Sequence, residues 1–226
     1  MKTIATIRND FSSKFGVPRQ PGLVPEIIST VVFEPEYRVA EALRGIEGYS
    51  HLWILWRFHQ AERDTWSPTV RPPRLGGNER VGVFATRSPF RPNPIGLSVV
   101  RLVAVERDER HGMVLRVSGA DMVDGTPVLD IKPYLPYADS VPEATGGFTD
   151  ATERRQLTVA CPERWLNVVP AEKREALLAL LRQDPRPAYQ HDSERVYGFG
   201  FGGLEVRFQV DGEALTVVEI TEEEKP

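Results

Sequence analysis

The stretch LSVVRLVAVERDERHGMVLRVSGADMVDGTPVLDI, residues 97–131, decides the fold class. It holds three short runs rich in valine, isoleucine and leucine, and turn-forming glycine, aspartate or proline lies between them, as is typical of strands. Seven such runs occur in the first part of the chain: Met1–Ile7, Ile27–Phe33, Leu52–Phe58, Val81–Ala85, Leu97–Val105, Met113–Ser118 and Val128–Ile131. Many short strands with few helices predict a mainly β fold with a small, closed or nearly closed β-barrel.

Helical spacing in this part is confined to Pro35–Arg44, where Gly45 supplies a stop. The strand pattern ends in small and polar residues at Gly146–Glu153, which predict a linker. We therefore expect a first domain over residues 1–147.

A second, smaller unit follows the predicted linker. It begins with a strand-like run at Gln156–Ala160, and Pro170–Arg182 is an amphipathic helix with acidic residues early and arginine late. Two alternating runs, Leu204–Val210 and Ala214–Ile220, flank Asp211–Gly212 as in a β-hairpin. This pattern predicts an α+β domain over residues 155–226.

Composition narrows the class of protein. The chain has 226 residues, a net charge of −4 and one cysteine, Cys161, so an intramolecular disulfide and a four-cysteine zinc site are excluded. The four histidines lack metal-ligand spacing, and no metal is expected. The opening residues lack the apolar core of a signal peptide, and no run approaches the roughly 20 apolar residues that span a bilayer. We expect no membrane association and a cytoplasmic location.

Positive charge is concentrated in one stretch of this acidic chain. Six arginines and one acidic residue, Glu79, lie between Arg71 and Arg101, so this stretch is a candidate cationic patch for a ligand that bears phosphate. The alternative is that these arginines merely decorate strand edges and loops.

The glycines Gly198, Gly200 and Gly203 have the spacing of a dinucleotide-binding fingerprint. That fingerprint requires a helix after the glycines, whereas LEVRFQV follows here and alternates as a strand does. A doubly wound nucleotide-binding fold is therefore not predicted. Composition and spacing leave two classes open, a β-rich enzyme and a nucleic-acid-binding module.

Five loop motifs carry a resemblance to a known family, and they lie in the first two thirds of the chain: PRQPG (18–22), SHLWILWRFHQ (50–60), RPPRLGGN (71–78), GVFATRSPFRPNPIG (82–96) and DGTPVLDIKPYLPYADS (124–140). In these motifs the chain resembles the TsaA-like family. The C-terminal unit matches more loosely, mainly through DPRPAY (184–189).

The resemblance implies a β-barrel methyltransferase that uses S-adenosylmethionine. It implies a homodimer whose cofactor site is shared between subunits, with PRQPG of one subunit against the pocket of the other. The substrate implied is threonylcarbamoyladenosine beside the anticodon of a tRNA, with threonine tRNA expected, methylated on the exocyclic nitrogen; the C-terminal domain would help to bind that tRNA. The cofactor-binding positions carried over are Pro18, Arg19, Gln20, His59, Gln60, Arg87, Leu97, Asp130, Ile131 and Lys132.

The chemistry of methyl transfer to nitrogen assigns further roles. His59 or Asp130 is a candidate acceptor for the proton of the exocyclic nitrogen. Arg87 and Lys132 suit a carboxylate of cofactor or substrate. The candidate RNA-binding residues are Arg71, Arg74, Arg91, Tyr134, Tyr137, Arg186 and Tyr189. Two alternatives remain, a non-catalytic RNA-binding barrel and a small-molecule methyltransferase.

Overall fold

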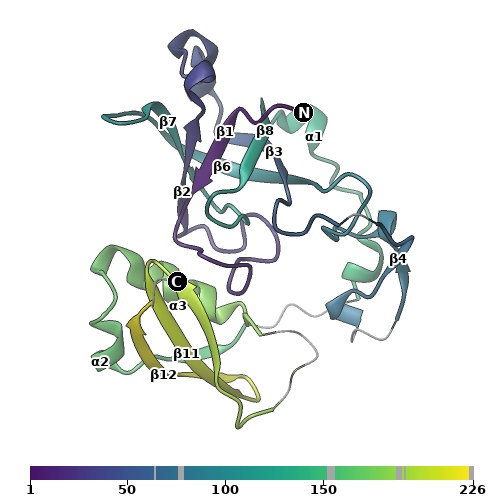
Figure 1. Cartoon of the computed structure of the whole chain (residues 1–226). Coiled ribbons are helices and arrows are strands. Elements are labelled where there is room, and N and C mark those ends of the chain that lie inside the picture. Colours follow the sequence, from purple (N-terminus) through teal and green to yellow (C-terminus); the bar gives the residue numbers. More distant parts are fainter. Residues whose placement is uncertain (64, 76–78, 152–155, 187–189, 191, 224–226) are drawn as a thin grey trace.

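A computed structural model of the protein describes residues 1–63, 65–75, 79–151, 156–186, 190 and 192–223, with only the backbone described at Arg74. Two sheets dominate it. Figure 1 shows a strongly curved sheet built from the first part of the chain and, below it, a smaller sheet from the last part with helix α3 (Arg174–Arg182) on one face.

The larger sheet contains six antiparallel strands: β1 (Ala5–Arg8), β2 (Ile28–Phe33), β3 (His51–Arg57), β6 (Ile95–Asp108), β7 (Gly112–Ser118) and β8 (Pro127–Pro133). They pair in the order β1-β2-β7-β6-β3-β8. Strand β8 pairs back with β1 through two register pairs, Ala5↔Val128 and Thr6↔Pro127, so the ring of pairings is closed by a short contact. The predicted mainly β fold is confirmed.

Alternation along each strand fills the interior of this ring. On β3, Leu52, Ile54 and Trp56 are buried, whereas the residues between them lie on the outer face. Val100 from β6 and Leu115 from β7 complete the same apolar cluster. Burial of these apolar side chains stabilises a sheet that is curved around them.

Two predictions in this domain were wrong in detail. Pro35–Arg44 is not one helix but two separate 3₁₀ turns, η1 (Pro35–Tyr37) and η2 (Ala40–Leu43), followed by η3 (Ile46–Gly48). Leu43 is the buried residue of these turns, so there is no apolar stripe that would stabilise a longer helix.

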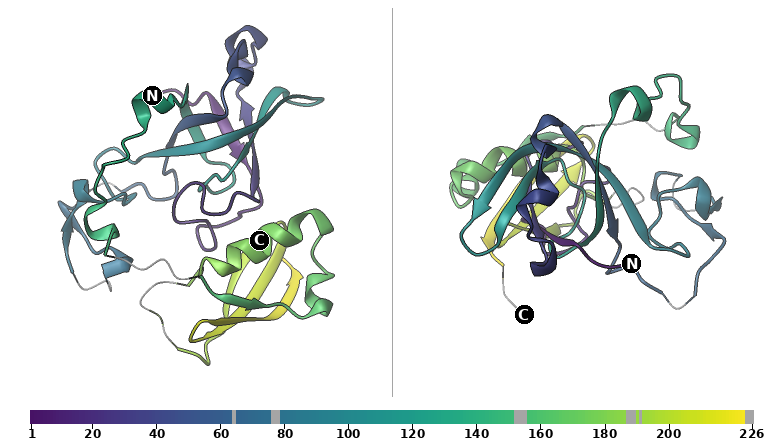
Figure 2. Two further views of the ribbon diagram at one scale, coloured as in Figure 1. Left: turned by 180° about the vertical axis from the view of Figure 1, so that it is seen from behind. Right: turned by 90° about the horizontal axis from the view of Figure 1, so that it is seen from above.

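The predicted strand Val81–Ala85 is the second departure, because only β5 (Val81–Gly82) is extended and η5 (Val83–Ala85) follows. Strand β5 pairs with β4 (Thr69–Val70), and η4 (Pro73–Leu75) lies between them. These elements form an arm that stands to one side of the large sheet in Figures 1 and 2.

The second sheet has the order β10-β11-β12-β9 and consists of β9 (Thr158–Ala160), β10 (Tyr197–Phe201), β11 (Leu204–Asp211) and β12 (Ala214–Glu222). The predicted helix is present as η7 (Ala171–Lys173) followed by α3. The run LEVRFQV is part of β11, which confirms the strand expected after the glycine pattern, and Gly198 and Gly200 lie inside β10. The remaining short elements are α1 (Pro136–Asp139), η6 (Gly147–Thr149) and α2 (Glu163–Leu166).

The segment between β1 and β2 connects two strands of the first sheet and packs against the second sheet. Phe11, Val24 and Ile27 are buried in the same apolar cluster as α3 and the second sheet, and the rings of Phe11 and Phe201 lie 5.8 Å apart. The loop at residues 14–20 is therefore held by the C-terminal part of the chain. None of the helices in the described residues is long and apolar enough to cross a membrane.

Candidate functional site

An open groove of about 2430 Å³ lies where the loop at residues 14–23, the end of β3, the arm and residues 183–186 meet. It brings together seven of the predicted cofactor-binding residues: Pro18, Arg19, Gln20, His59, Gln60, Arg87 and Leu97. They come from four segments that are far apart in the sequence. This convergence makes the groove the candidate functional site.

The PRQPG loop forms one wall of the groove and is tied to two other segments. Arg87 donates a hydrogen bond of 2.6 Å to Gln20. Arg19 donates to the backbone carbonyls of Asp184, at 3.3 Å, and of Arg186. Gln20 and Arg87 thus meet within one chain.

Arg186, a predicted RNA contact, is buried beneath this wall. Its Nε and one terminal nitrogen each lie 2.9 Å from a carboxylate oxygen of Asp184, and these hydrogen bonds raise the pKa of the guanidinium. A bidentate pair of this kind fixes the loop geometrically. In this conformation Arg186 supports the loop that Arg19 binds.

The carboxylate of Asp121 lies in the wall of the groove at the end of a hydrogen-bonded chain. The indole Nε1 of Trp56 donates to the Ser98 hydroxyl at 2.9 Å, and Ser98 donates to Asp121 Oδ1 at 2.5 Å. Burial raises the pKa of the Asp121 carboxyl to about 6, although the hydrogen bond from Ser98 and the charge of Arg87 lower it. Perturbed carboxyl groups in a groove are frequent at functional sites.

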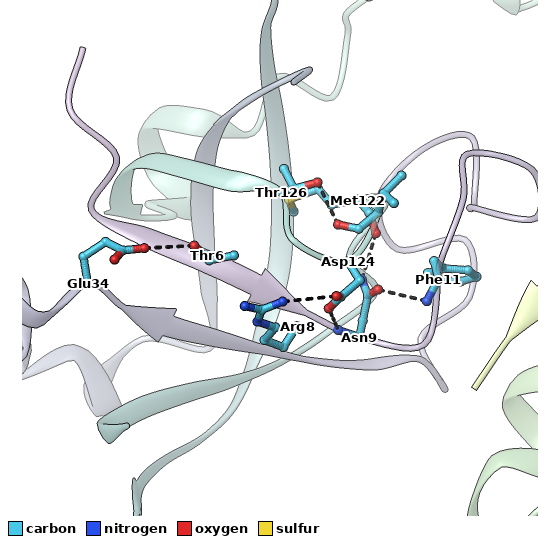
Figure 3. A network of polar contacts seen from close by, with 9 residues as sticks. Thr6, Arg8, Asn9, Phe11, Glu34, Met122, Asp124 and Thr126 are labelled. Atoms are coloured by element: carbon cyan, nitrogen blue, oxygen red, sulfur yellow. Dashed lines mark hydrogen bonds and ion pairs between the residues drawn. The ribbon is translucent and has the colours of Figure 1, made fainter. Parts of the chain in front are cut away.

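The turn that carries Asp121 is anchored to the end of β1 (Figure 3). Asp124 accepts hydrogen bonds from the backbone N–H of Asn9, at 3.0 Å, and from Arg8, at 3.2 Å. The Asn9 amide in turn donates to the carbonyl of Met122 at 2.8 Å. These contacts fix the turn at Met122 and Asp124, so they also restrict where the neighbouring Asp121 lies.

No role was predicted for Asp121 from the sequence. Its partners Ser98 and Trp56 are 23 and 65 residues away in the sequence. The pairing of β6 with β7 brings Ser98 near Asp121, and the pairing of β3 with β6 places Trp56 beside Ser98. The local signal is an aspartate that follows the strand-like run Met113–Ser118 after two small residues, Gly119 and Ala120.

The three predicted site residues on β8 lie outside the groove. Asp130 and Lys132 form an ion pair of 3.0 Å on the outer face of β8, and Ile131 packs against the barrel core. Asp130 is in register with Leu55 of β3, which is in register with Leu97 of β6. Leu97 thus connects the groove with the outer face that carries Asp130.

Only some of the predicted RNA-binding residues line the groove. Arg71 and Arg91 line the groove, and Arg91 donates a hydrogen bond to the carbonyl of Thr86. Tyr134 packs beside Trp53 and Tyr137 is exposed, and both lie away from the groove. The Arg74 side chain and Tyr189 lie outside the described residues.

Two aromatic residues of the arm were not predicted as site residues. Trp66 and Phe84 line the groove with 52% and 73% of their surface exposed, and their rings lie 6.2 Å apart. Large aromatic side chains within a polar, proline-rich loop are the sequence signal that was available. The described residues contain no group of three or more His, Cys, Asp or Glu side chains suited to a metal ion.

The six antiparallel strands pair in a ring beside an arginine-bearing groove, and this architecture is distinct from the doubly wound nucleotide-binding folds. The chain belongs to the tRNA-methyltransferase O family: residues 6–140 match the model of its N-terminal domain, and residues 156–223 match that of the TrmO C-terminal domain.

Relatives and a solved structure agree with this membership. The chain is 46% identical over 215 residues to the tRNA (adenine(37)-N6)-methyltransferase of Escherichia coli K12, which covers 92% of this chain and 91% of the relative. It is also 46% identical over 215 residues to a Pseudomonas aeruginosa protein named "Putative S-adenosylmethionine-dependent methyltransferase RcsF", with 91% and 90% covered. The crystal structure of TrmO from P. aeruginosa superposes with a TM-score of 0.79 at 37% identity, covering 98% of this chain and 95% of that one.

Proposed function

We propose that this protein methylates the exocyclic nitrogen of threonylcarbamoyladenosine beside the anticodon of a tRNA, threonine tRNA in the first place. The observation that carries the proposal is the similarity to the E. coli tRNA (adenine(37)-N6)-methyltransferase over nearly the whole of both chains. Family membership makes the protein an enzyme that methylates tRNA with S-adenosylmethionine. The proposal adds two points to what family membership gives: the threonylcarbamoyl group on the substrate and the choice of threonine tRNA.

The groove offers side chains that suit S-adenosylmethionine, which when bound supplies a methyl group from a sulfonium. Arg87 suits the carboxylate of its methionine part. The apolar surfaces of Phe58 and Leu97 in the groove suit the adenine ring. Pro18, Gln20, His59 and Gln60 border the same space. The donor set and the walls therefore fit this cofactor.

The arm supplies surfaces that suit RNA. Arg71 and Arg91 can neutralise phosphates, and an exposed aromatic pair, Trp66 and Phe84, can stack on unpaired bases. We propose that the anticodon loop enters along this arm and that the C-terminal domain, which fixes the PRQPG loop, assists its binding.

The proposed function is tested with tRNA nucleosides from cells that lack the gene. Mass spectrometry should show threonylcarbamoyladenosine without its methylated form, and purified protein with S-adenosylmethionine should restore the methyl group on threonine tRNA. A tRNA that binds without methylation would favour an RNA-binding barrel. Unchanged nucleosides in cells that lack the gene would favour a small-molecule methyltransferase.

Replacement of Arg87 by alanine should weaken S-adenosylmethionine binding about 10- to 150-fold, because a charge-assisted hydrogen bond contributes about 1.5–3 kcal/mol. Isothermal titration calorimetry measures this affinity. Arg110→Ala, an equal change at the exposed β6–β7 turn, is the matched control and should bind the cofactor as the unaltered protein does. Equal affinities for Arg87→Ala and Arg110→Ala would remove Arg87 from the cofactor site.

We further propose a homodimer in which the outer face of β8 of one subunit completes the groove of the other. Within one chain the predicted cofactor residues fall into two groups. Gln20 and Arg87 line the groove, whereas Asp130 and Lys132 lie on the outer face of β8, outside the groove. Leu97 and Val103 on the outer face of β6 are both about half exposed, at 52% and 51%, as suits a surface that a second copy covers.

A complementation experiment tests the shared site. Arg87→Ala and Lys132→Ala chains should each be weakly active, whereas a purified heterodimer should recover about half of the unaltered activity, because one of its two sites then contains both intact residues. A heterodimer of Arg87→Ala with a chain altered at both Arg87 and Lys132 has no intact site and serves as the control. Heterodimers without recovery would contradict a shared site.

A further inference from the structure

Proton transfer from the substrate nitrogen needs an acceptor that this chain must supply. The exocyclic nitrogen of a carbamoylated adenine is conjugated to a carbonyl and is a weak nucleophile until its proton is accepted. Of the two acceptors predicted from the sequence, Asp130 is engaged by Lys132 on the outer face of β8. His59 and Asp121 are the candidates that line the groove.

The hydrogen-bonded chain behind Asp121 has a fixed direction. Indole Nε1 is only a donor, so Ser98 must accept from Trp56 and must use its own hydrogen toward Asp121. Ser98 is fully buried and Trp56 is 6% exposed, so water does not compete for these groups. Asp121 is thereby held as an acceptor, with lone pairs left over for a proton that arrives from the groove.

The surroundings of Asp121 keep its charge available for reaction. Ser98 of β6 donates a hydrogen bond to the carboxylate, and Trp56 of β3 stands behind Ser98. Arg87, from the loop before β6, acts on the carboxyl through its charge. The other titratable groups that line the groove include Lys14, His59, Glu62, Arg91 and Asp184. A carboxyl pKa of about 6 leaves Asp121 mostly ionised at neutral pH yet basic enough to accept a proton.

We propose that the Asp121 carboxylate accepts the proton of the exocyclic nitrogen during methyl transfer, with Ser98 and Trp56 as its positioning residues. The inference rests on the proposed function. The nitrogen–hydrogen bond breaks and its proton goes to Asp121, a nitrogen–carbon bond forms, and the carbon–sulfur bond breaks with its electron pair left on sulfur. One negative and one positive charge disappear together, and a partly desolvated site favours that outcome.

The near-isosteric variant Asp121→Asn tests this role, because its amide oxygen can still accept from Ser98. With threonine tRNA from cells that lack the gene, kcat should fall about 10²- to 10⁴-fold. S-adenosylmethionine affinity, measured by calorimetry, should stay within about threefold, since the fold and the Ser98 contact persist. Asp108→Asn at the last residue of β6, away from the groove, is the matched control and should keep full kcat.

The pH dependence separates a proton acceptor from a structural residue. For the unaltered enzyme kcat should decline below a midpoint of about 6, and Asp121→Asn should lose this decline. Ser98→Ala should move the midpoint to higher pH, because the Ser98 hydrogen bond lowers the pKa of the carboxyl. The His59→Asn variant should keep the decline. Carbon-13 NMR of labelled aspartate in the unliganded protein should show a carboxyl that titrates near pH 6 and is missing from Asp121→Asn.

The outcomes separate the two proposals. If the unaltered enzyme leaves threonine tRNA unmethylated, the proposed function fails and this inference fails with it. If the unaltered enzyme is active and Asp121→Asn keeps more than a tenth of its kcat, or keeps the acidic decline, the inference alone is overturned. Loss of kcat together with loss of the acidic decline supports it.

Discussion

Replacement of Phe11 by alanine should lower the free energy of unfolding by about 3–5 kcal/mol, the usual cost of deleting a fully buried phenylalanine. Phe11 has no exposed surface and packs on Phe201 in the apolar cluster of the second sheet. Urea denaturation followed by tryptophan fluorescence measures the loss.

The same replacement should also weaken S-adenosylmethionine binding, because Phe11 anchors the segment that leads into the PRQPG loop. The control is Phe84→Ala, the same change at a side chain that is 73% exposed, and it should leave the unfolding free energy within about 0.5 kcal/mol. If Phe11→Ala and Phe84→Ala had equal stabilities, the apolar cluster would not hold the two parts of the chain together.

Gly96→Ala should be the second severe change. A methyl group at this position would overlap the indole ring of Trp56. Overpacking costs about 1–3 kcal/mol, and displacement of the indole would also break its hydrogen bond to Ser98, which contributes about 0.5–1.5 kcal/mol.

Thermal unfolding and methyl transfer should both report this change, because Trp56 positions Ser98 and through it Asp121. Gly48→Ala is the matched control: its backbone needs no positive φ and the added methyl group would meet nothing within 4 Å. Unchanged stability of Gly96→Ala would show that Trp56 moves aside freely and does not fix Ser98.

Strands were predictable wherever one face of the sheet is buried. The alternation in LWILWRF identifies β3 because every second residue contributes to the core, and the Asp211–Gly212 turn identifies the last hairpin. The Pro35–Arg44 segment shows that helical spacing of apolar residues does not by itself predict a helix. A helix of this length needs an apolar face that packs against the rest of the protein, and this segment forms two 3₁₀ turns instead.

The residues of the candidate site were predictable from the sequence only where they lie in one of the recognised loop motifs. Pro18, Gln20, His59 and Arg87 meet in the groove as expected for one site. Asp121 had no such signal, because what distinguishes it from Asp124 or Asp130 is burial beside Ser98. The contact with Ser98 depends on the register of β6 with β7, and a single sequence does not specify register between strands.

The apolar cluster that joins residues 11–27 to α3 and the second sheet affects the order in which the parts of the chain fold during synthesis. Residues 11–27 leave the ribosome early, but their partners in α3 and the second sheet lie beyond residue 157 and emerge much later. Contacts of such sequence separation form slowly, and the wait leaves Phe11, Val24 and Ile27 exposed on the nascent chain. We expect the barrel to fold first and its PRQPG loop to become ordered last. A ribosome that stalls before residue 157 would therefore hold a folded barrel with an unordered PRQPG loop, and if that loop belongs to the proposed cofactor site, we expect the unfinished chain not to consume S-adenosylmethionine.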